Sequence, residues 1–372
     1  MKQLKPKSVD SVLLTIIGLM VAGGFLIFSS ASLGLMARDG ASFGSVAFNQ
    51  FLFGVVGGSI ALLVISNVYY RNWSKYAFYL FIASLLLTLA VFIPGLGMTH
   101  AGATRWLDLG FVTLQPSEFL KIGFVIYLAT WLSGMQSRIH VWKYGLFPFM
   151  GIVGAVGTVM LLQPDTDTFL IMAMSGMAMF LVAGARWRDI GILVVAGVLI
   201  LAAVAMMRPY IMDRLTTFLD PSADPLGSGY QIQQSLIAVG SGGMTGRGFG
   251  QSIQKFEYLP EPIGDSVFAV YAEEFGFIGS FLLVLSFIIM TLRGYRIATQ
   301  AKDMFGSILV VGFMTLIVGQ AFLNIGAMLA IAPLSGLPLP FISHGGTALM
   351  STLASLGIVL NVSKYRSFKK HS

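Results

Sequence analysis

Residues 256–276, FEYLPEPIGDSVFAVYAEEFG, combine a concentration of acidic side chains with the start of a long apolar run. The stretch closes a polar, glycine-rich loop that begins near Met206 and interrupts an otherwise almost continuous series of apolar segments. It holds five carboxylates, the last two of which fall inside a predicted membrane helix: Glu257, Glu261, Asp265, Glu273 and Glu274. The sequence therefore predicts that the chemistry is concentrated here and that the remaining segments build a membrane scaffold around it.

The composition indicates a single polytopic membrane domain over residues 1–372. Hydrophobic residues make up 56% of the chain and charged residues only 10%, whereas soluble domains carry roughly 25% charge. Runs of ~18 or more apolar residues recur, as expected for membrane helices. The chain has no cysteine, which excludes disulfides and cysteine-ligated zinc. Its four histidines form no HxxH or HExxH pattern, so no histidine metal site is assigned.

The apolar runs predict an all-α fold with about ten transmembrane helices. A large extracellular loop, about 208–264, is expected between the seventh and eighth helices, and its QIQQSLIAV segment is predicted to form a short interfacial helix. The basic N-terminus leads into an apolar run that is too long for a signal-peptide core, so an uncleaved first span is expected. The predicted helices cover 11–34, 46–66, 76–94, 117–133, 144–162, 168–185, 189–207, 266–291, 306–332 and 345–362.

The charges predict the orientation of these spans. With the N-terminus inside, 16 of the 23 lysines and arginines fall in inner segments, which satisfies the positive-inside rule with both termini cytoplasmic. The same placement accounts for the net charge of +7 without a nucleic-acid partner. On the acidic side, 13 of the 16 carboxylates lie in outer loops or in the helix segments leading from them. Mixed charge on the outer side indicates a polar cavity that opens outward.

The outer segment GATRWLDLGFVTLQPSEFLK offers a charged pair at the start of a helix. Pro116 suits the first helical position, and Glu118 in the first turn is favoured by the helix dipole. Lys121 follows three residues later on the same face. One interpretation is a structural ion pair. The alternative is that Lys121 and Arg105 bind an anionic head group while Glu118 positions the lysine.

Two further motifs lie at predicted turns on the outer side. In LQPDTDTF, Asp165 and Asp167 are spaced to bind a divalent cation, or at least one of them caps the next helix. The segment PLSGLPLPFISHGGTALM is broken by proline and glycine at membrane depth, where irregular backbone must be buried in protein or line a cavity. Ser343 and His344 are candidate lining groups. A glycine-rich helix start that permits close packing explains the segment equally well.

Helix phase distinguishes the carboxylates of the opening stretch. For a helix starting near Asp265, Glu273 lies close to the face of Asp265, whereas Glu274 points roughly opposite. Asp265 is then at the membrane–water boundary, with Glu273 about 12 Å deeper. A boundary carboxylate can reach the soluble reacting group of a lipid whose tail stays in the bilayer. Asp265 is therefore the catalytic candidate, and Glu273 with Glu274 is predicted to form structural pairs.

Taken together, these segments resemble the SEDS family of polytopic bacterial proteins, represented by FtsW, RodA and SpoVE. The matching stretches follow the family's order through most of the chain, and QSIQKFEYLPE is more similar to the division member FtsW than to the elongation member RodA. The stretches are RWLDLG, QPSEFLK, LLQPDTDTF, FLDPSADPLGSGYQIQQSLIAVGSGGMTGRGFG, KFEYLPEPIGDSVFAVYAEEFG and GLPLPFISHGG.

The resemblance implies a peptidoglycan glycosyltransferase of the bacterial cytoplasmic membrane that polymerises lipid II at the outer face during division or elongation. It implies a class B penicillin-binding transpeptidase as partner, and it places the aspartate on which the family depends at Asp265. Residues that the family keeps around its outward cavity fall on Arg105, Glu118, Lys121 and Asp165. This chain departs from the family pattern where Ile263 and Gly264 replace His-Thr, and where Asp167 replaces a glycine.

Glycosyl transfer needs a base for the acceptor hydroxyl and positive charge for the departing pyrophosphate. Asp265 is assigned as the base, with Mg²⁺ or Mn²⁺ as an optional cofactor. The pyrophosphate is assigned to a subset of basic residues, and four residues of the outer segments complete the predicted substrate-binding set. The basic residues are Arg105, Lys121, Arg208 and Arg214, and the others are Gln233, Glu261, Ser343 and His344.

Two other functions fit the same features. Ten spans, broken helices and intramembrane carboxylates also suit a flippase that moves the lipid-linked precursor. Alternating access, however, requires polar groups along both halves of the path, and the inner half has few. A non-catalytic scaffold for a division or elongation complex is the third possibility. Glycan chains made from labelled lipid II would favour the enzyme, whereas lipid scrambling without polymer would favour the flippase.

Overall fold

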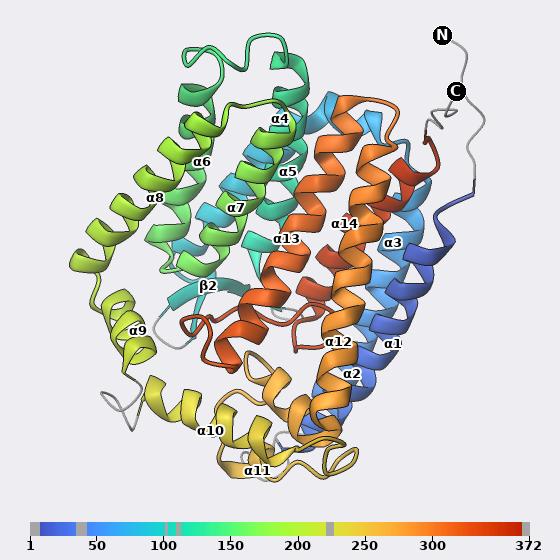
Figure 1. Ribbon diagram of the computed structural model, residues 1–372, viewed down its shortest axis with the longest axis vertical. Coiled ribbons are helices and arrows are strands. Elements are labelled where there is room, and N and C mark those ends of the chain that lie inside the picture. Colours follow the sequence, from blue (N-terminus) through green and yellow to red (C-terminus); the bar gives the residue numbers. More distant parts are fainter. Residues whose placement is uncertain (1–7, 35–42, 101–102, 109–112, 221–226, 367–372) are drawn as a thin grey trace.

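The computed structural model describes residues 8–34, 43–100, 103–108, 113–220 and 227–366. Its helices lie side by side in one elongated bundle (Figure 1). Among the described residues, eight helices are long and apolar enough to cross a membrane, and α6 and α7 are shorter apolar helices. The prediction of an all-α polytopic membrane fold with about ten spans is confirmed.

The bundle helices and the elements that connect them follow one another along the chain without a separate soluble unit among the described residues. In order they are α1 Ser11–Ser32, α2 Phe43–Asn49, the π-helix η2 Gln50–Gly57, α3 Gly58–Asn67, α4 Arg71–Leu89, the 3₁₀ turn η3 Ala90–Phe92, β1 Gly97–His100, β2 Ala103–Asp108, β3 Thr113–Leu114, α5 Pro116–Met135, α6 Leu146–Leu162, α7 Thr166–Val182, α8 Trp187–Met207, α9 Pro209–Leu219, α10 Ser228–Ser241, α11 Gln254–Glu257, α12 Val267–Thr299, α13 Met304–Met328 and α14 Gly346–Ser363.

The centre of the bundle is formed by α13 and α14, and α8 lies at its edge. Of the most apolar window of α14, 83% is buried, against 6% for α8. Small residues allow the central helices to approach closely. A Cβ on Gly357 of α14 would lie 2.9 Å from the carbonyl oxygen of Leu62 in α3, so α3 and α14 pack almost backbone to backbone. The surface of α8 is correspondingly free to face lipid.

Both ends of the described chain lie on one face, which we call the termini face. The amide of Asp10 donates to Ser363 at the end of α14 (3.0 Å), and the Asp10 carboxylate pairs with Arg293 (2.8 Å). Asp303, between α12 and α13, pairs with Arg71 at the start of α4. An even number of spans places the two termini on the same side, and these contacts agree with that.

The opposite face, which we call the site face, carries β1–β3, α9, α10, α11 and the irregular segment 329–345 between α13 and α14 (lower part of Figure 1). The three strands form an antiparallel sheet in which Met98 is opposite Trp106 and Leu107 opposite Leu114. This sheet was not predicted. Its strands are too short to show a clear alternating pattern beside apolar spans. The predicted short helix is confirmed as α10, and most of PSADPLGSGY lies outside the described residues.

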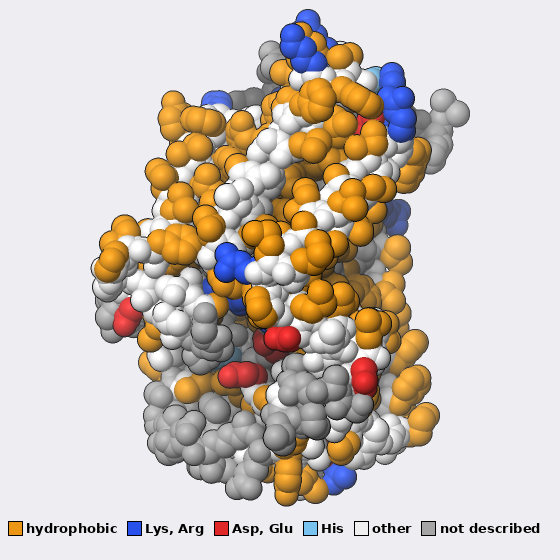
Figure 2. Space-filling model, turned by 90° about the vertical axis from the view of Figure 1, so that its left-hand side faces the viewer, with side chains coloured by type: hydrophobic (Ala, Val, Ile, Leu, Met, Phe, Trp, Pro, Cys, Tyr) orange, Lys and Arg blue, Asp and Glu red, His pale blue; other side chains and the backbone are white. Residues whose placement is uncertain are grey.

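Figure 2 shows that one flank is covered mostly by hydrophobic side chains, as expected for contact with lipid. Several basic side chains lie at its upper end and others lie at mid-height and near the lower end, while most acidic side chains on this flank lie in the lower half, towards the site face. The acidic side chains are thus concentrated towards the site face, where basic side chains also occur, in agreement with the mixed charge inferred from the sequence for the outer side.

The helix that follows the acidic stretch differs from its prediction. It starts at Val267 rather than Asp265, and Gly276 interrupts it with φ 64° and ψ −162°. The glycine-rich segment of residues 243–248 fills the break. Its carbonyls accept the amides of Phe277 (2.9 Å) and Ile278 (3.1 Å), and its amides donate to the carbonyls of Glu273 and Glu274 (both 3.0 Å). The segment thereby satisfies backbone groups that a broken helix would otherwise leave unpaired.

Candidate functional site

Asp265 meets two arginines beside Gly336. A Cβ placed on Gly336 would lie 3.7 Å from Asp265 Oδ2, 3.9 Å from Arg105 Nη1 and 3.9 Å from Arg214 Nη2. These side chains come from the turn before α12, from β2 and from α9, while Gly336 belongs to the irregular segment after α13. A larger residue at 336 would occupy the space that the three charged groups share. The fold thus brings one carboxylate and two guanidinium groups to one point on the site face.

The turn that carries Asp265 is fixed through its backbone. The amides of Gly264 and Ser266 donate to the carbonyl of Glu261 (3.0 and 3.2 Å), whose φ of 45° is a left-handed conformation. Asn324 of α13 donates to the carbonyl of Asp265 (2.8 Å), and the Ser343 hydroxyl donates to that of Gly264 (2.7 Å). The backbone is therefore held on two sides by buried polar side chains, and the carboxylate is left free to act.

The Asp265 carboxylate itself makes no hydrogen bond or ion pair with any residue that the structure describes. The side chain is partly exposed. Burial among protein atoms raises its pKa to about 7; the carboxylates of Glu261 and Asp167 also raise it, while Arg214 and Arg105 oppose the rise. A group with a pKa near neutrality can both accept and release a proton at working pH. These properties suit a general base.

The two arginines are held by the start of α7. Arg214 Nη1 pairs with Asp167 Oδ2 at 2.7 Å, and the amide of Gly336 donates to the same oxygen at 3.0 Å. The Arg105 guanidinium donates to the carbonyls of Gln163 (3.4 Å) and Pro164. The turn between α6 and α7 therefore aims both cations at the space beside Asp265.

The two aspartates at this turn have different roles. Asp165 caps α7 by accepting the Thr168 amide (3.4 Å), as one sequence alternative predicted. Burial raises the pKa of Asp165, and its Oδ2 has no hydrogen-bond partner among the residues that the structure describes. Within the described ranges, no three His, Asp or Glu side chains are grouped as metal ligands. The carboxylates near Asp265 lie beside the guanidinium groups of Arg105 and Arg214, so these residues as arranged do not fit a Mg²⁺ or Mn²⁺ site. The divalent cation predicted from the sequence stays a prediction.

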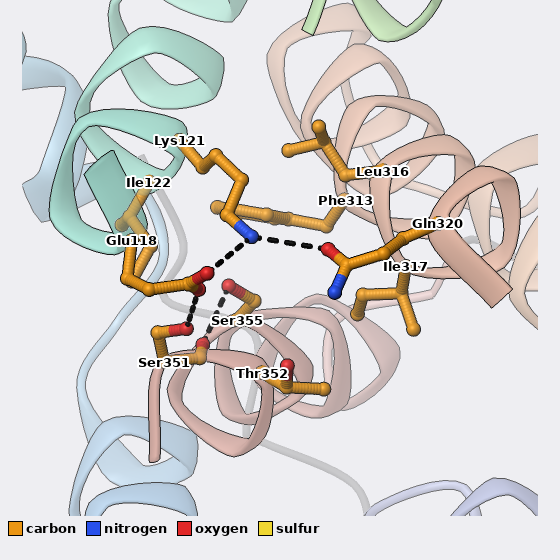
Figure 3. Close-up of a pocket in the computed structure, with 10 residues that line it drawn as sticks. All are labelled: Glu118, Lys121, Ile122, Phe313, Leu316, Ile317, Gln320, Ser351, Thr352 and Ser355. Carbon is orange, nitrogen blue, oxygen red and sulfur yellow. Dashed lines mark hydrogen bonds and ion pairs between the residues drawn. The ribbon is translucent and has the colours of Figure 1, made fainter. Parts of the chain in front are cut away.

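Glu118 and Lys121 belong to a second polar cluster, between α5, α13 and α14 (Figure 3). Lys121 Nζ contacts Glu118 Oε1 at 2.8 Å and Gln320 Oε1 at 3.1 Å, and Ser351 donates to Glu118 Oε2 at 2.5 Å. The groups line a cavity of about 20 Å³, which has room for one water molecule. This pair is buried, and each of its charged groups is satisfied by polar partners on other helices, as a structural ion pair requires.

Two amides of α13 link this second cluster to the turn of Asp265. Gln320 accepts from Lys121 and donates to the Pro338 carbonyl (2.7 Å), while Asn324 donates to the carbonyls of Asp265 and Leu337 (both 2.8 Å). Neither amide was among the predicted site residues. The available signal was their spacing of four residues on one face of an otherwise apolar span.

Several predicted substrate-binding residues lie elsewhere. Gln233 is exposed on α10, and Gln231, some 200° away around the helix, donates to Ser266 instead (3.1 Å). Arg208 is exposed at the start of α9, and its side chain has no hydrogen-bond or ion-pair partner among the described residues. Glu261 is exposed beside the turn of Asp265, and its charge acts on that residue.

Ser343 and His344 support the site rather than line it. The buried Ser343 hydroxyl accepts the Leu339 amide and donates to Gly264. The His344 amide donates to the Ile263 carbonyl (2.7 Å), and its ring stacks on Phe28 with the ring centres 6.0 Å apart. Both residues attach the irregular segment to the turn before α12. The broken backbone is thus buried against protein, as its depth in the bundle requires.

The prediction of structural pairing for Glu273 and Glu274 is confirmed. Glu274 lies 2.7 Å from Lys255 Nζ and accepts the Ser30 hydroxyl of α1. Glu273 accepts the Ser252 hydroxyl (2.6 Å) and the amides of residues 253 and 254, and Arg247 lies 3.3 Å away. Both carboxylates are fully buried. They attach the glycine-rich loop to the broken helix.

Comparison with known proteins identifies the family. Residues 10–368 match the model of a family described as cell cycle protein, FtsW/RodA/SpoVE. The chain belongs to the FtsW/RodA/SpoVE family. Stage V sporulation protein E of Bacillus subtilis is 39% identical over 97% of this chain and 99% of its own length. A probable peptidoglycan glycosyltransferase FtsW of Geobacter metallireducens is 36% identical over 95% of this chain and 93% of its own length.

Solved structures show the same fold. RodA of Thermus thermophilus superposes with a TM-score of 0.71 at 27% identity, covering 96% of this chain and 98% of RodA. A chain from a peptidoglycan synthase complex gives 0.78 at 28% identity, covering 95% of this chain and 97% of that chain. The FtsW/RodA/SpoVE fold and the prediction of a peptidoglycan glycosyltransferase are confirmed at the level of enzyme class.

Proposed function

We propose that this FtsW/RodA/SpoVE-type glycosyltransferase polymerises lipid II, with Asp265 as general base and Arg105 and Arg214 as the cations that receive the pyrophosphate. The observation that supports this assignment is the convergence of Asp265, Arg105 and Arg214 beside Gly336. Of the four basic candidates, these two arginines lie next to Asp265, whereas Lys121 is paired in the second cluster and Arg208 is exposed.

The reaction uses each of these groups once. The acceptor 4-hydroxyl forms a bond to the anomeric carbon of the donor sugar, and the bond from that carbon to the pyrophosphate oxygen breaks. Asp265 takes the hydroxyl proton and later releases it to water. The pyrophosphate leaves with the bonding electrons, and the two guanidinium groups offset its charge.

The test is a polymerisation assay with labelled lipid II and the purified full-length chain. Replacing Asp265 with asparagine removes the base while preserving the shape of the side chain. Glycan synthesis is expected to fall by about 100-fold or more. Asp213→Asn is the matched control, because Asp213 is an exposed carboxylate on α9 that is outside the charged group. Retained polymerisation by folded Asp265→Asn protein, or equal losses in both variants, would refute the assignment.

We also propose that the site face is the outer face of the bacterial cytoplasmic membrane and that both termini are cytoplasmic. The charge segregation supports this orientation. Because the chain has no cysteine, single cysteines can test it without background labelling. A cysteine at Leu219 of α9, which is 75% exposed, should react with an impermeant maleimide in cells whose cytoplasmic membrane is accessible and intact. A cysteine at the equally exposed Trp187 should not, and the reverse pattern would invert the orientation.

A class B penicillin-binding transpeptidase is the proposed partner. A structural neighbour is described as coordinating polymerization and crosslinking in a peptidoglycan synthase complex. The polymerisation assay should therefore be run with and without the transpeptidase encoded by the same organism, and with and without a chelator. Failure of that protein to co-purify with this chain or change its glycan synthesis would argue against the partnership, and the chelator tests the predicted cation.

A further inference from the structure

Asp167 connects three elements of the site face. It lies in the first turn of α7, pairs with Arg214 of α9 at 2.7 Å, and accepts the amide of Gly336 at 3.0 Å. One oxygen, Oδ2, takes part in both contacts. The carboxylate thereby fixes the guanidinium relative to the backbone around which Asp265 and Arg105 also gather.

The helix that carries Arg214 has little packing of its own. It contacts α10 and α8, of which α8 lies at the edge of the bundle, and Thr217 is the buried residue of its eleven. A short helix with so few buried side chains is not held in place by its apolar contacts. Its position over the site therefore depends on polar contacts, among which the ion pair with Asp167 reaches α7.

Arg214 uses its two amino groups differently. Nη1 binds Asp167, while Nη2 is the nitrogen that lies near Gly336 and on the side of Asp265. The planar guanidinium fork makes this division possible, because fixing one amino group also fixes the direction of the other. A lysine at this position could satisfy one partner only.

We propose that Asp167 is a positioning residue that holds Arg214 so that its second amino group faces the pyrophosphate of the lipid-linked donor. The inference rests on the proposed function, since it assigns the donor pyrophosphate to the space beside Gly336. The pyrophosphate is already anionic before the reaction, so Arg214 binds it in the ground state as well as in the transition state. Loss of its orientation therefore weakens donor binding more than it slows the chemical step.

The kinetic test compares Asp167→Asn, Arg214→Gln and the double variant in the lipid II polymerisation assay. Asp167→Asn is expected to raise KM about 10-fold and to change kcat less than about 3-fold, because the Arg214 guanidinium loses its orientation but keeps its charge. Arg214→Gln removes the cation itself, so it should raise KM at least as much and also lower kcat. The double variant should match Arg214→Gln, since Asp167 has nothing left to position once the guanidinium is gone. Asp167→Glu should recover most of the lost affinity, and Asp213→Asn again serves as control.

A second measurement follows α9 without relying on activity. Cysteines introduced at the exposed Leu170 of α7 and Leu219 of α9 can carry spin labels in this cysteine-free chain. The distance distribution between them is expected to be narrow in the parent protein and to broaden in Asp167→Asn. It should remain narrow in Asp213→Asn.

The outcomes separate this inference from the proposed function. Additive effects of Asp167→Asn and Arg214→Gln, unchanged KM values, or an unchanged distance distribution would overturn the positioning role. In each of those cases the parent protein would still polymerise lipid II and Asp265→Asn would still be inactive. If the parent and Asp265→Asn proteins made equal amounts of polymer, the proposed function would fail, whatever the distance distribution showed.

Discussion

Asp265 and Glu274 lie nine positions apart in one acidic stretch, yet the fold gives them opposite surroundings. Glu274 is fully buried and satisfied by Lys255 and Ser30. Asp265 is partly exposed, its carboxylate has no hydrogen bond or ion pair within the described part of the chain, and both like and opposite charges lie nearby. Buried charges are tolerated when they are fully paired. A carboxylate left without such partners beside two cations is available for chemistry.

The comparison extends to their neighbours. Around Asp265 the polar side chains bind the backbone, so the carboxylate is positioned without being neutralised. Around Glu273 and Glu274 the polar side chains bind the carboxylates directly. These side chains include Ser252 of the glycine-rich loop and Ser30 of α1. The contacts around Asp265 leave its carboxylate free to react, whereas the contacts around Glu273 and Glu274 use the carboxylates to hold neighbouring segments together.

The largest predicted effect on stability comes from breaking the ion pair between Glu274 and Lys255. Glu274→Gln leaves the fully buried Lys255 ammonium without its counter-charge, so the free energy of unfolding should fall by about 3–5 kcal/mol. The measurement is the melting temperature of the detergent-purified protein. Asp265→Asn should leave that temperature unchanged or raise it.

A compensating variant sharpens this contrast. Changing Lys255 to methionine in the Glu274→Gln protein removes the unpaired charge, and part of the stability should return. A melting temperature for Glu274→Gln equal to that of Asp265→Asn would show that the two carboxylates do not differ as described.

A smaller loss is expected when the break in α12 is obstructed. Gly276 has φ 64°, and a Cβ there would lie 2.3 Å from the amide nitrogen of Gly246. Gly276→Ala should therefore cost about 2–4 kcal/mol through backbone strain and overpacking. Gly240→Ala, on α10, is the control, because nothing lies within 4 Å of the added methyl. Equal melting temperatures for the two variants would contradict the interlocked arrangement.

The mildest perturbation is a change of pH, which acts on Asp265 while leaving the sequence intact. With a pKa of about 7, the base is protonated in acid, so kcat/KM should rise about tenfold per pH unit below pH 7 and level off above it. A rate profile without a limb near pH 7, or an identical limb for Asp265→Glu and the parent enzyme, would exclude Asp265 as its source.

The same group links pH to stability. Its folded pKa lies above the value of about 3.9 for an unfolded aspartate. The stability contributed by the neutral form is therefore complete below about pH 4 and is lost as pH rises to about 7. Asp265→Asn, which stays neutral, should gain stability relative to the parent across that interval. A constant difference in melting temperature between pH 4 and 8 would contradict the raised pKa.

Hydrophobic run length was sufficient to predict a bundle of about ten apolar helices, while Asp265 was singled out by helix phase and by the family resemblance. Helix phase was less reliable, because it assumed an unbroken helix from Asp265. The structure has a turn before Val267 and a break at Gly276. Gln231 contacts Ser266 whereas the predicted Gln233 does not, because the face of α10 that meets Ser266 depends on tertiary packing.

The convergence of Asp265, Arg105 and Arg214 beside Gly336 could not be predicted from sequence patterns. Arg105, Arg214 and Asp265 are far apart in the chain, and no local period relates them. Their meeting depends on how β2, α9 and the irregular segment fold back over the bundle. The functions of Gln320 and Asn324 were hidden in the same way, because their partners are backbone carbonyls that carry no sequence signal.

The break at Gly276 also bears on how the protein enters the membrane. The part of α12 from Phe277 to Thr299 extends roughly 34 Å at 1.5 Å per residue, which spans the hydrocarbon core by itself. Glu273 and Glu274 precede this part, whose charged residues are Arg293 and Arg296 near its far end, so an apolar segment can enter lipid without burying either acid. Their partners Arg247 and Lys255 precede α12 in the chain and are therefore synthesised earlier, so the ion pairs can form once the apolar segment is in place. A single glycine thus separates the segment that is inserted from the segment that folds.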